Sequence, residues 1–524
     1  MNGPKFEVKD GFENDCRTKV VKFITMDIVT SLMPVIFELL CLLLAIPLLT
    51  GGFSLLSMPA GRLGWMNLGS SALTFVMVWG VVYIVAARGM IQTGMFYLDA
   101  LNATMLLVIG TLSFTAAWFS LSYMRRELEH GHLSARMLSR YYALLQLFIF
   151  TMLVVLMVEN LGLIWVAVEA TTLASALLVA FYFNRSALEA AWKYVMVCTV
   201  GICLALLGTI LLYYTQVNAV GGGDHALSWL SLRDHADLLD PGLIKLSFVF
   251  LLVGYGTKAG LAPMHTWLPD AHSQAPSPVS GLLSGALLSC ALYALIRNMI
   301  IVQGALGPLF GQQLLLAFGV ISVAVSIPFV LVQHDLKRLL AYSSVEHMGL
   351  VALGLGIGTP LAIFGALFHV LNHALAKSSL FYLAGMITQG YHTKYIMRIS
   401  GLVREMPVTG WMFVLGLLAI TGTPPFGVFT SKFVILRAAF ESGNIFLGSS
   451  VLVLLVAVFA GMIYYCLRMA FGQVTYKHHV QPAAGSSIAA VIFSLAVLVV
   501  SGFYLPEWLY LMLTRAAAIV KGGV

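Results

Sequence analysis

Long runs of apolar residues recur along almost the whole chain. About fourteen can be read, each close to the roughly 20 residues that a helix needs to cross a bilayer. They lie near residues 28 to 50, 64 to 87, 97 to 123, 139 to 158, 160 to 182, 191 to 215, 243 to 266, 276 to 303, 309 to 333, 338 to 358, 360 to 390, 408 to 441, 447 to 471 and 486 to 513. Because the runs are continuous rather than alternating, they predict membrane helices and not a barrel of strands. With 60% hydrophobic and 10% charged residues, the chain is expected to be an all-α polytopic membrane protein.

Basic residues gather in three loops on one side of the predicted membrane. They are Arg125, Arg126, Arg136 and Arg140, then Lys337 and Arg338, then Lys394, Arg398 and Arg404. The positive-inside rule places this side in the cytoplasm and both termini outside. The polar tail at 1–27 carries lysines and arginines that oppose this orientation. The net charge of +7 is therefore interpreted as a topology signal and not as a surface for nucleic acid.

Ionisable residues inside the spans carry most of the functional information. A charged side chain at the centre of a membrane helix costs roughly 2.5 to 3.5 kcal/mol, so each one needs a partner, water or a function. The candidates for a proton or ion pathway are Glu169, Lys193, Lys258, His265, Glu346, His347, His369, His373, Lys377 and Lys432.

Two groups of these residues follow the same order along the chain. Glu169, Lys193 and Lys258 lie in three successive spans, and so do Glu346, Lys377 and Lys432. The groups are five spans apart, an odd number, which predicts two inverted five-helix repeats. The expected units are a tail at 1–27, N-terminal helices at 28–138, a first repeat at 139–303, a second repeat at 304–471, and a C-terminal helix with a tail at 472–524.

Each predicted repeat has one span that contains glycine, proline and a lysine. Gly254, Gly256, Gly260 and Pro263 surround Lys258, and the stretch "TGTPPFG" at 421 to 427 precedes the lysine of the second repeat. Irregular backbone at membrane depth survives only where it is buried in protein or lines a wet cavity. Each repeat is therefore expected to contain one broken helix, with ordinary kinks in packed helices as the alternative.

The stretch "FHVLNHALAK" places His369, His373 and Lys377 at successive i, i+4 positions along one helix face. Three titratable groups in a column suit a proton relay, and fixed ion pairs between helices are the alternative. Glu169 is expected within ion-pair or single-water reach of Lys193 or Lys258, because an unpaired buried carboxylate would neutralise.

No cofactor or metal is expected in this chain. None of its six cysteines is in a C-x-x-C spacing, so no iron–sulfur, zinc or nickel site is indicated. The stretch "HTWLPDAH" could hold a metal through His265, Asp270 and His272, but it is interpreted as a polar connector at a helix break. Two glycine-rich stretches, "VGGGD" and "GLGIGTP", are interpreted as loops and helix ends, since no strand precedes them.

Five stretches together resemble one family, the antiporter-like membrane subunits. They are "VEATTLASALL", "TKAGLAPMHTWLPDAHSQAPSPVS", "HDLKRLLAYSSVEHMG", "FHVLNHALAKSSLFYLAG" and "TGTPPFGVFTSKF". This family includes the large membrane subunits of respiratory complex I, multisubunit sodium/proton antiporters and group 4 membrane-bound hydrogenases. Within it, the length and the stretches "VEATTLASALLVAFYFNRSALEAAWKY" and "SSVEHMG" resemble the F subunits of hydrogenase-4.

The resemblance implies a role for each residue of the two groups. Glu169 would be the gating carboxylate, with Lys193 modulating it. Lys258 would be the lysine of the first half-channel, Lys377 the central lysine and Lys432 the lysine at the exit half-channel.

One position departs from the pattern expected of the complex I relatives. Where they would have a lysine in the eighth span, this chain reads "LLSCALYA", with Ser289 at that place. A serine cannot carry a proton on and off as a cation. The link from Lys258 to Lys377 is therefore expected to run through water, helped by Tyr293.

The resemblance implies a subunit that translocates protons or sodium ions in a bacterial or archaeal plasma membrane. Electron transfer would take place in partner subunits that hold iron–sulfur centres and, in hydrogenases, nickel–iron centres. The expected partners are other membrane subunits and a peripheral redox arm, with no nucleic acid. A subunit of a stand-alone sodium/proton antiporter and a non-conducting scaffold stay open as alternatives. A quinone-reducing enzyme is disfavoured because the chain has no redox cofactor ligands.

Overall fold

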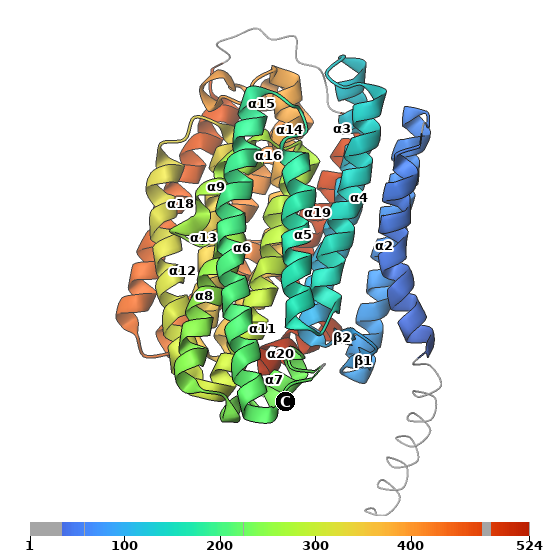
Figure 1. Ribbon diagram of the computed structural model, residues 1–524. Coiled ribbons are helices and arrows are strands. Elements are labelled where there is room, and N and C mark those ends of the chain that lie inside the picture. Colours follow the sequence, from blue (N-terminus) through green and yellow to red (C-terminus); the bar gives the residue numbers. More distant parts are fainter. Residues whose placement is uncertain (1–33, 57, 224, 474–483, 523–524) are drawn as a thin grey trace, which may run out of the picture.

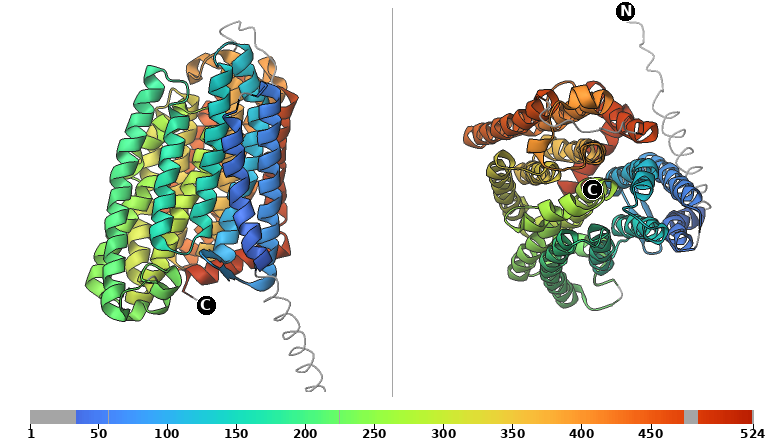
Figure 2. Two further views of the ribbon diagram at one scale, coloured as in Figure 1. Left: turned by 45° about the vertical axis from the view of Figure 1, so that its right-hand side comes forward. Right: turned by 90° about the horizontal axis from the view of Figure 1, so that it is seen from above.

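The computed structural model describes residues 34–473 and 484–522, apart from residues 57 and 224. The helices stand side by side in one tall bundle (Figure 1), and the view from above shows them grouped around its centre (Figure 2). In the described part of the chain, 13 helices are long and apolar enough to cross a membrane. The all-α polytopic class is therefore confirmed.

The elements follow one another along the chain as a first helix, Pro34–Ser54, and then α2 (Ala60–Arg88), β1 (Ile91–Thr93), β2 (Phe96–Leu98), α3 (Ala100–Glu129), α4 (Ala135–Met157), α5 (Leu161–Val179), α6 (Arg185–Val220), α7 (Trp229–Asp234), η1 (Ala236–Leu238), α8 (Pro241–Ala259), η2 (Met264–Thr266), α9 (Trp267–Gln274), α10 (Ser277–Leu282), η3 (Leu283–Leu287), α11 (Leu288–Leu306), α12 (Pro308–Leu331), α13 (Leu336–Ile357), α14 (Pro360–Tyr391), η4 (Ile396–Arg398), α15 (Leu402–Glu405), α16 (Pro407–Thr421), α17 (Gly427–Glu441), α18 (Ile445–Phe471), α19 (Gly485–Phe503) and α20 (Glu507–Val520). Polar side chains cap the first turns of many of these helices, as Asp99 does for α3 and Asn160 for α5.

The three basic loops meet at one end of the bundle, as the sequence predicts. Gln389 donates a hydrogen bond to Glu127 over 2.7 Å, which joins the end of α14 to the end of α3. Lys394 pairs with Asp335 over 3.2 Å, which joins the loop after α14 to the loop before α13. We call this the basic end. The antiparallel hairpin β1–β2 lies at the opposite end, the hairpin end, with α7 (Figure 1). The tail at 1–27 lies outside the described residues.

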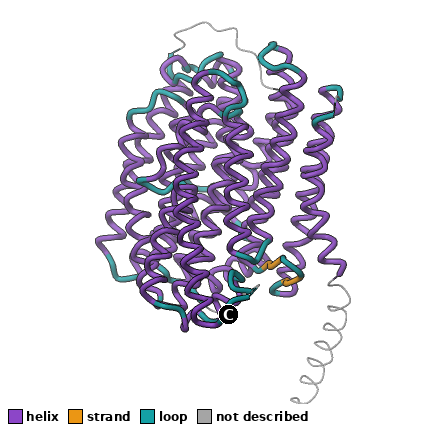
Figure 3. Tube along the Cα trace, viewed as in Figure 1, coloured by secondary structure: helices purple, strands orange, loops and turns teal. Residues whose placement is uncertain are grey.

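Both predicted helix breaks are present. Helix α8 ends at Ala259, where Gly260 takes a φ of +77° that a glycine adopts without strain. Helix α16 ends at Thr421, followed by Gly422 with a φ of +85°, and α17 begins only at Gly427. Loop segments therefore lie inside the bundle, away from both of its ends (Figure 3). The span predicted at 408 to 441 is thus two helices of 15 residues each, too short to count among the 13.

The inverted relation between the two repeats stays a prediction. Each predicted repeat contains one of the two breaks, and each break lies next to the predicted lysine. Lys258 is the penultimate residue of α8, whereas the corresponding lysine of the second repeat lies in the second turn of α17. The two lysines therefore flank their breaks on opposite sides.

A helix that is shielded from lipid on all sides lies in the middle of the bundle. The span Ser277–Leu306, made of α10, η3 and α11, has 100% of its most apolar 18 residues buried, against 28% for Ile445–Phe471. One turn of it, η3, is π-helical, a widening of the helix that occurs frequently at functional sites.

Glycines let α12 and α13 approach closely. We expect Gly356→Ala to lower the free energy of unfolding by about 1 to 3 kcal/mol, which is the usual cost of overpacking a core. A Cβ at Gly356 would lie 2.5 Å from the backbone nitrogen of Leu316, which cannot move without shifting α12. Thermal unfolding of the purified protein measures the effect. Gly69→Ala is the matched control, because a Cβ at Gly69 meets nothing within 4 Å. Equal melting temperatures for the two variants would contradict the prediction.

Candidate ion-translocation site

Lys258 is fully buried at the end of α8 and faces helix α5. Its ammonium donates to the carbonyl oxygen of Val168 over 2.9 Å and to the hydroxyl of Thr172. That hydroxyl in turn donates to Oε2 of Glu169 over 3.0 Å. Thr172 therefore joins the lysine and the carboxylate of the first group through a single oxygen atom.

Among the described residues, Glu169 forms no direct ion pair with a lysine. Thr172 stands where the sequence led us to expect either a salt bridge or one water molecule. From α6, Thr199 approaches Glu169 to 3.5 Å. Lys193 lies six residues before Thr199, which is about 9 Å along a helix.

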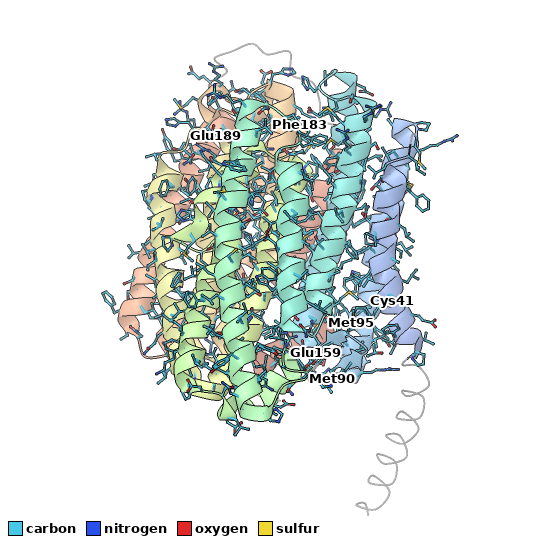
Figure 4. The ribbon with its side chains drawn as sticks, viewed as in Figure 1. Cys41, Met90, Met95, Glu159, Phe183 and Glu189 are labelled. Carbon is cyan, nitrogen blue, oxygen red and sulfur yellow. The ribbon has the colours of Figure 1, made fainter. Side chains whose placement is uncertain are left out.

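Lys193 instead binds two carboxylates near the basic end. Its ammonium lies 2.7 Å from Glu189 and 3.3 Å from Asp270, and Figure 4 shows Glu189 close to that end of the bundle. Of the two lysines expected near Glu169, the structure therefore places Lys258 beside it, through Thr172, and Lys193 farther away. Half of the Lys193 side chain is exposed, because its long stem carries the ammonium outward from the start of α6.

Asp270, which the sequence analysis did not include in the ion pathway, lies next to Lys193. It pairs with Arg338 of α13 as well as with Lys193 of α6, so it ties three helices together. These three residues line a polar pocket of about 490 Å³ at the basic end. The available signal was an acidic residue shortly after a helix break, which we interpreted as part of a connector.

His265 lies apart from the other candidates. It is buried in the broken segment, on η2, and its ring packs edge-on against Phe329 and Tyr342, each 6.2 Å away between centroids. Its Nδ1 has no hydrogen-bond partner among the described residues. Nowhere in the described chain do three or more His, Cys, Asp or Glu side chains gather closely enough to hold a metal ion.

In the second group, Glu346 and Lys432 form a direct ion pair. The Lys432 ammonium lies 2.8 Å from Oε1 of Glu346, and the two side chains are only 10% and 2% exposed. The same ammonium lies 3.4 Å from the carbonyl oxygen of Thr421, the last residue of α16. The helix break therefore supplies a second acceptor for the buried cation.

The histidines extend this ion pair into a chain of buried titratable groups. Nε2 of His347 lies 3.6 Å from Oε2 of Glu346. The other ring nitrogen of His347, Nδ1, lies 2.8 Å from Nε2 of His369. His369 then reaches the hydroxyl of Ser431 over 2.9 Å. The centroid of the His373 ring lies 5.1 Å from that of His347. In the described part of the chain, neither nitrogen of His373 has a hydrogen-bond partner. The predicted column on α14 thus gains His347 from α13.

Lys377 repeats the arrangement of Lys258. It is fully buried and donates to one backbone carbonyl, that of Leu340 over 2.6 Å, and to one hydroxyl, that of Ser343. The neighbouring hydroxyl of Ser344 lies 2.8 Å from that of Ser284 in the π-helical turn η3. The hydroxyls of Ser343 and Ser344 both donate to the carbonyl oxygen of Leu340, over 3.0 and 3.2 Å, so polar groups extend from Lys377 to the central helix.

Ser289 and Tyr293 do not complete the link between the two groups by direct contact. The hydroxyl of Ser289 donates to the carbonyl oxygen of Gly285 in its own helix over 2.7 Å. Tyr293 binds Asn102 over 2.8 Å and Arg297 over 3.1 Å. It therefore belongs to a separate cluster near the hairpin end, and not to a path between Lys258 and Lys377.

We expect Thr172→Val to reduce ion pumping by about tenfold, because valine keeps the shape but removes a hydrogen bond to charged groups worth about 1.5 to 3 kcal/mol. Pumping by the reconstituted complex measures the effect. Thr74→Val is the matched control, since Thr74 is equally buried and its hydroxyl donates to the carbonyl oxygen of Ser70 in its own helix, α2. Equal pumping by both variants would show that the bridge has no role.

The chain matches two protein families. Residues 158–463 match the family described as NADH:quinone oxidoreductase/Mrp antiporter, transmembrane region, and residues 91–132 match the NADH-ubiquinone oxidoreductase (complex I) chain 5 N-terminus. The chain is also 41% identical over 410 residues to the hydrogenase-4 component F homolog of Methylacidiphilum infernorum (isolate V4), covering 78% of this chain and 85% of that protein.

Solved structures share the fold. A chain of the membrane-bound sulfane sulfur reductase, an archaeal respiratory membrane complex, superposes with a TM-score of 0.81 at 24% identity, covering 92% of this chain and 98% of that one. A chain of respiratory complex I from Thermus thermophilus superposes with a TM-score of 0.77 at 22% identity, covering 92% of this chain and 100% of that one. The resemblance inferred from the motifs is confirmed. The chain belongs to the NADH:quinone oxidoreductase/Mrp antiporter family of membrane subunits.

Proposed function

We propose that this chain is the proton-translocating membrane subunit of an oxidoreductase of the hydrogenase-4 or complex I type. Electron transfer in partner subunits, which would hold the iron–sulfur and nickel–iron centres, drives ion movement through this bundle. The observation that carries the proposal is the buried chain Lys432, Glu346, His347 and His369, whose successive contacts are 2.8, 3.6 and 2.8 Å. Placing such a line of titratable groups at membrane depth costs free energy, and groups of this kind usually mark an ion pathway or a proton relay.

The two kinds of lysine suggest a division of roles. Lys258 and Lys377 are held by one carbonyl and one hydroxyl, whereas Lys432 touches a carboxylate. A carboxylate stabilises the charged form of a lysine more than neutral oxygen atoms do. We assign proton release and uptake to Lys258 and Lys377. The Glu346–Lys432 ion pair acts on these two lysines electrostatically.

The polar pocket around Asp270 supports proton entry from the basic end. It lies where α9 follows the helix break, so water there approaches the first group from that side. The inverted repeats at 139–303 and 304–471 would give the second group the opposite access. The basic end would face the cytoplasm, in the plasma membrane of a bacterium or archaeon.

A stand-alone cation/proton antiporter is the second candidate, because the matching family is named for Mrp antiporters as well as for NADH:quinone oxidoreductase. A scaffold that conducts nothing would have no use for the buried histidines. Purification of the tagged chain from its native membrane separates the first two candidates. Co-purified redox subunits support the proposal, and antiporter subunits without them support the second candidate.

Reconstitution of the purified complex tests transport itself. Liposomes containing the complex and a pH-sensitive dye are given an electron donor, and the internal pH is followed. A pH change that an uncoupler abolishes supports proton translocation. Redox turnover with neither a pH change nor uptake of labelled sodium would leave only a scaffold role.

A further inference from the structure

A cavity of about 690 Å³ lies at the hairpin end of the bundle. Its lining comes from elements far apart in the sequence, from the end of α2 to the end of α20. Tyr97, Asp99 and Trp229 contribute to its wall and are almost fully buried. We call it the hairpin-end pocket.

Arg297 of α11 packs against these three wall residues and is 1% exposed. Its Nη2 lies 2.7 Å from Oδ1 of Asp99 and also donates to Asn102. Its guanidinium carbon lies 4.4 Å from the ring centroid of Trp229 and 5.4 Å from that of Tyr97. The cation is therefore enclosed by one carboxylate, one amide and the faces of aromatic rings.

Hydrogen-bonding capacity remains on both members of the ion pair. Oδ2 of Asp99 and Nη1 of Arg297 are buried, yet neither has a hydrogen-bond partner among the residues that the structure describes. Buried polar groups are rarely left unsatisfied. Asp99 also lines the hairpin-end pocket, so the ion pair lies directly at the wall of that pocket.

A polar face of α11 runs from this cluster toward the centre of the membrane. Ser289, Tyr293 and Arg297 follow one another at intervals of four residues, so they share one side of the helix over about 12 Å. Tyr293 is already bonded to Arg297 over 3.1 Å. Arg297 thus stands between the pocket and the middle of the bundle.

The cluster keeps a positive charge despite the carboxylate of Asp99. Asp99 also caps α3, where its Oδ1 accepts from the backbone nitrogens of Leu101 and Asn102 over 2.9 and 3.1 Å. A helix N-terminus carries a partial charge of about +0.5. One carboxylate therefore faces a full guanidinium charge and a helix N-terminus together.

We propose that Arg297 is a charge barrier that stops protons and other cations from passing between the hairpin-end pocket and the buried lysines. This inference rests on the proposed function, because a barrier matters only in a chain that moves ions. A fixed arginine charge excludes cations from narrow polar paths. Arginine suits the task since its guanidinium stays protonated in proteins. A solely structural ion pair is the alternative.

Passive proton permeability tests the barrier without any redox turnover. Liposomes containing the complete complex receive a potassium diffusion potential, and an internal dye reports proton entry. The double variant D99N/R297Q removes both charges and leaves no lone buried ion. We expect its proton flux to exceed that of the wild type by about tenfold or more. A flux equal to that of the wild type would overturn the proposal.

Arg233→Gln is the matched control. Arg233 also stacks on Trp229, at 5.2 Å, but its side chain is 30% exposed and pairs with Asp234. Its loss should leave the passive flux unchanged, and an equally large flux in this variant would overturn the barrier. Donor-driven pumping by the wild type is measured separately. Its absence would refute the proposed function, whereas the passive flux reports on Arg297 alone.

Arg297→Lys keeps the test decisive if the double variant does not assemble. A buried lysine can lose its proton, whereas arginine cannot. The flux through Arg297→Lys should therefore match that of the wild type near neutral pH and rise above it as the pH approaches about 10. A flux that stays at the wild-type level throughout would overturn the proposal.

Discussion

Replacing Lys258 by arginine will leave the complex assembled and active in electron transfer but abolish ion pumping. Arginine keeps the positive charge and can still donate to Val168 and Thr172, so the contact between α8 and α5 is preserved. Its proton stays bound at any pH that the protein survives. If Lys258 gives up and regains a proton in each cycle, Lys258→Arg should therefore fail at pumping about as completely as Lys258→Ala.

The measurement is donor-driven pH change in proteoliposomes, together with the amount of assembled complex and its redox rate. Lys245→Arg is the control, because Lys245 is an exposed lysine of the same helix. It should pump like the wild type. Wild-type pumping by Lys258→Arg would show that Lys258 serves as a fixed charge and that translocation follows another route.

Removal of the Glu346 carboxylate will cost about 3 to 5 kcal/mol of stability, because it leaves the Lys432 ammonium buried without its counter-charge. Both side chains lie at the point where α13 meets the start of α17, and neither reaches solvent to any large extent. Glu346→Ala should therefore lower the unfolding temperature of the purified protein sharply. The double variant E346A/K432A should recover part of the loss, since no lone ion remains.

The exposed pair Arg437–Glu441 gives the comparison for this prediction. Nε of Arg437 lies 2.7 Å from Oε1 of Glu441, a distance similar to that of the buried pair, but the two side chains are 60% and 51% exposed. Glu441→Ala should cost no more than about 0.5 kcal/mol. If Glu346→Ala and the double variant unfold at the same temperature, the Lys432 ammonium must find another partner. The buried pair would then contribute little to stability.

The spans and both breaks were predictable because they depend on local sequence. Hydropathy over about 20 residues decides whether a helix can cross a bilayer, and Gly260 and Gly422 end their helices by adopting positive φ. The pairing of charged residues depends instead on how helices rotate and pack against one another. Glu346 and Lys432 are 86 residues apart, and nothing local shows that this lysine, rather than Lys377, meets the carboxylate.

The contacts that the sequence did not predict have the same origin. Lys193 lies near the start of a span, and its long side chain reaches Asp270 and Glu189 near the basic end. Thr172 was not singled out because a hydroxyl in an apolar run ordinarily bonds to its own helix. Arg297 escaped notice because it lies close to the end of the run predicted at 276 to 303, where arginine is common.

The enclosure of α11 constrains how the protein can be synthesised. The α10 and η3 parts of the same span pack against α13 and α14, which follow it in the chain, so translation must proceed some 85 residues beyond Leu306 before they are available. At usual elongation rates that takes on the order of ten seconds. During that time Arg297 needs a partner, because an unpaired arginine resists insertion into the bilayer. Asp99, Asn102 and Trp229 all precede it in the chain. The nascent helix can therefore pair its charge with residues already made, before the second half of the protein leaves the ribosome.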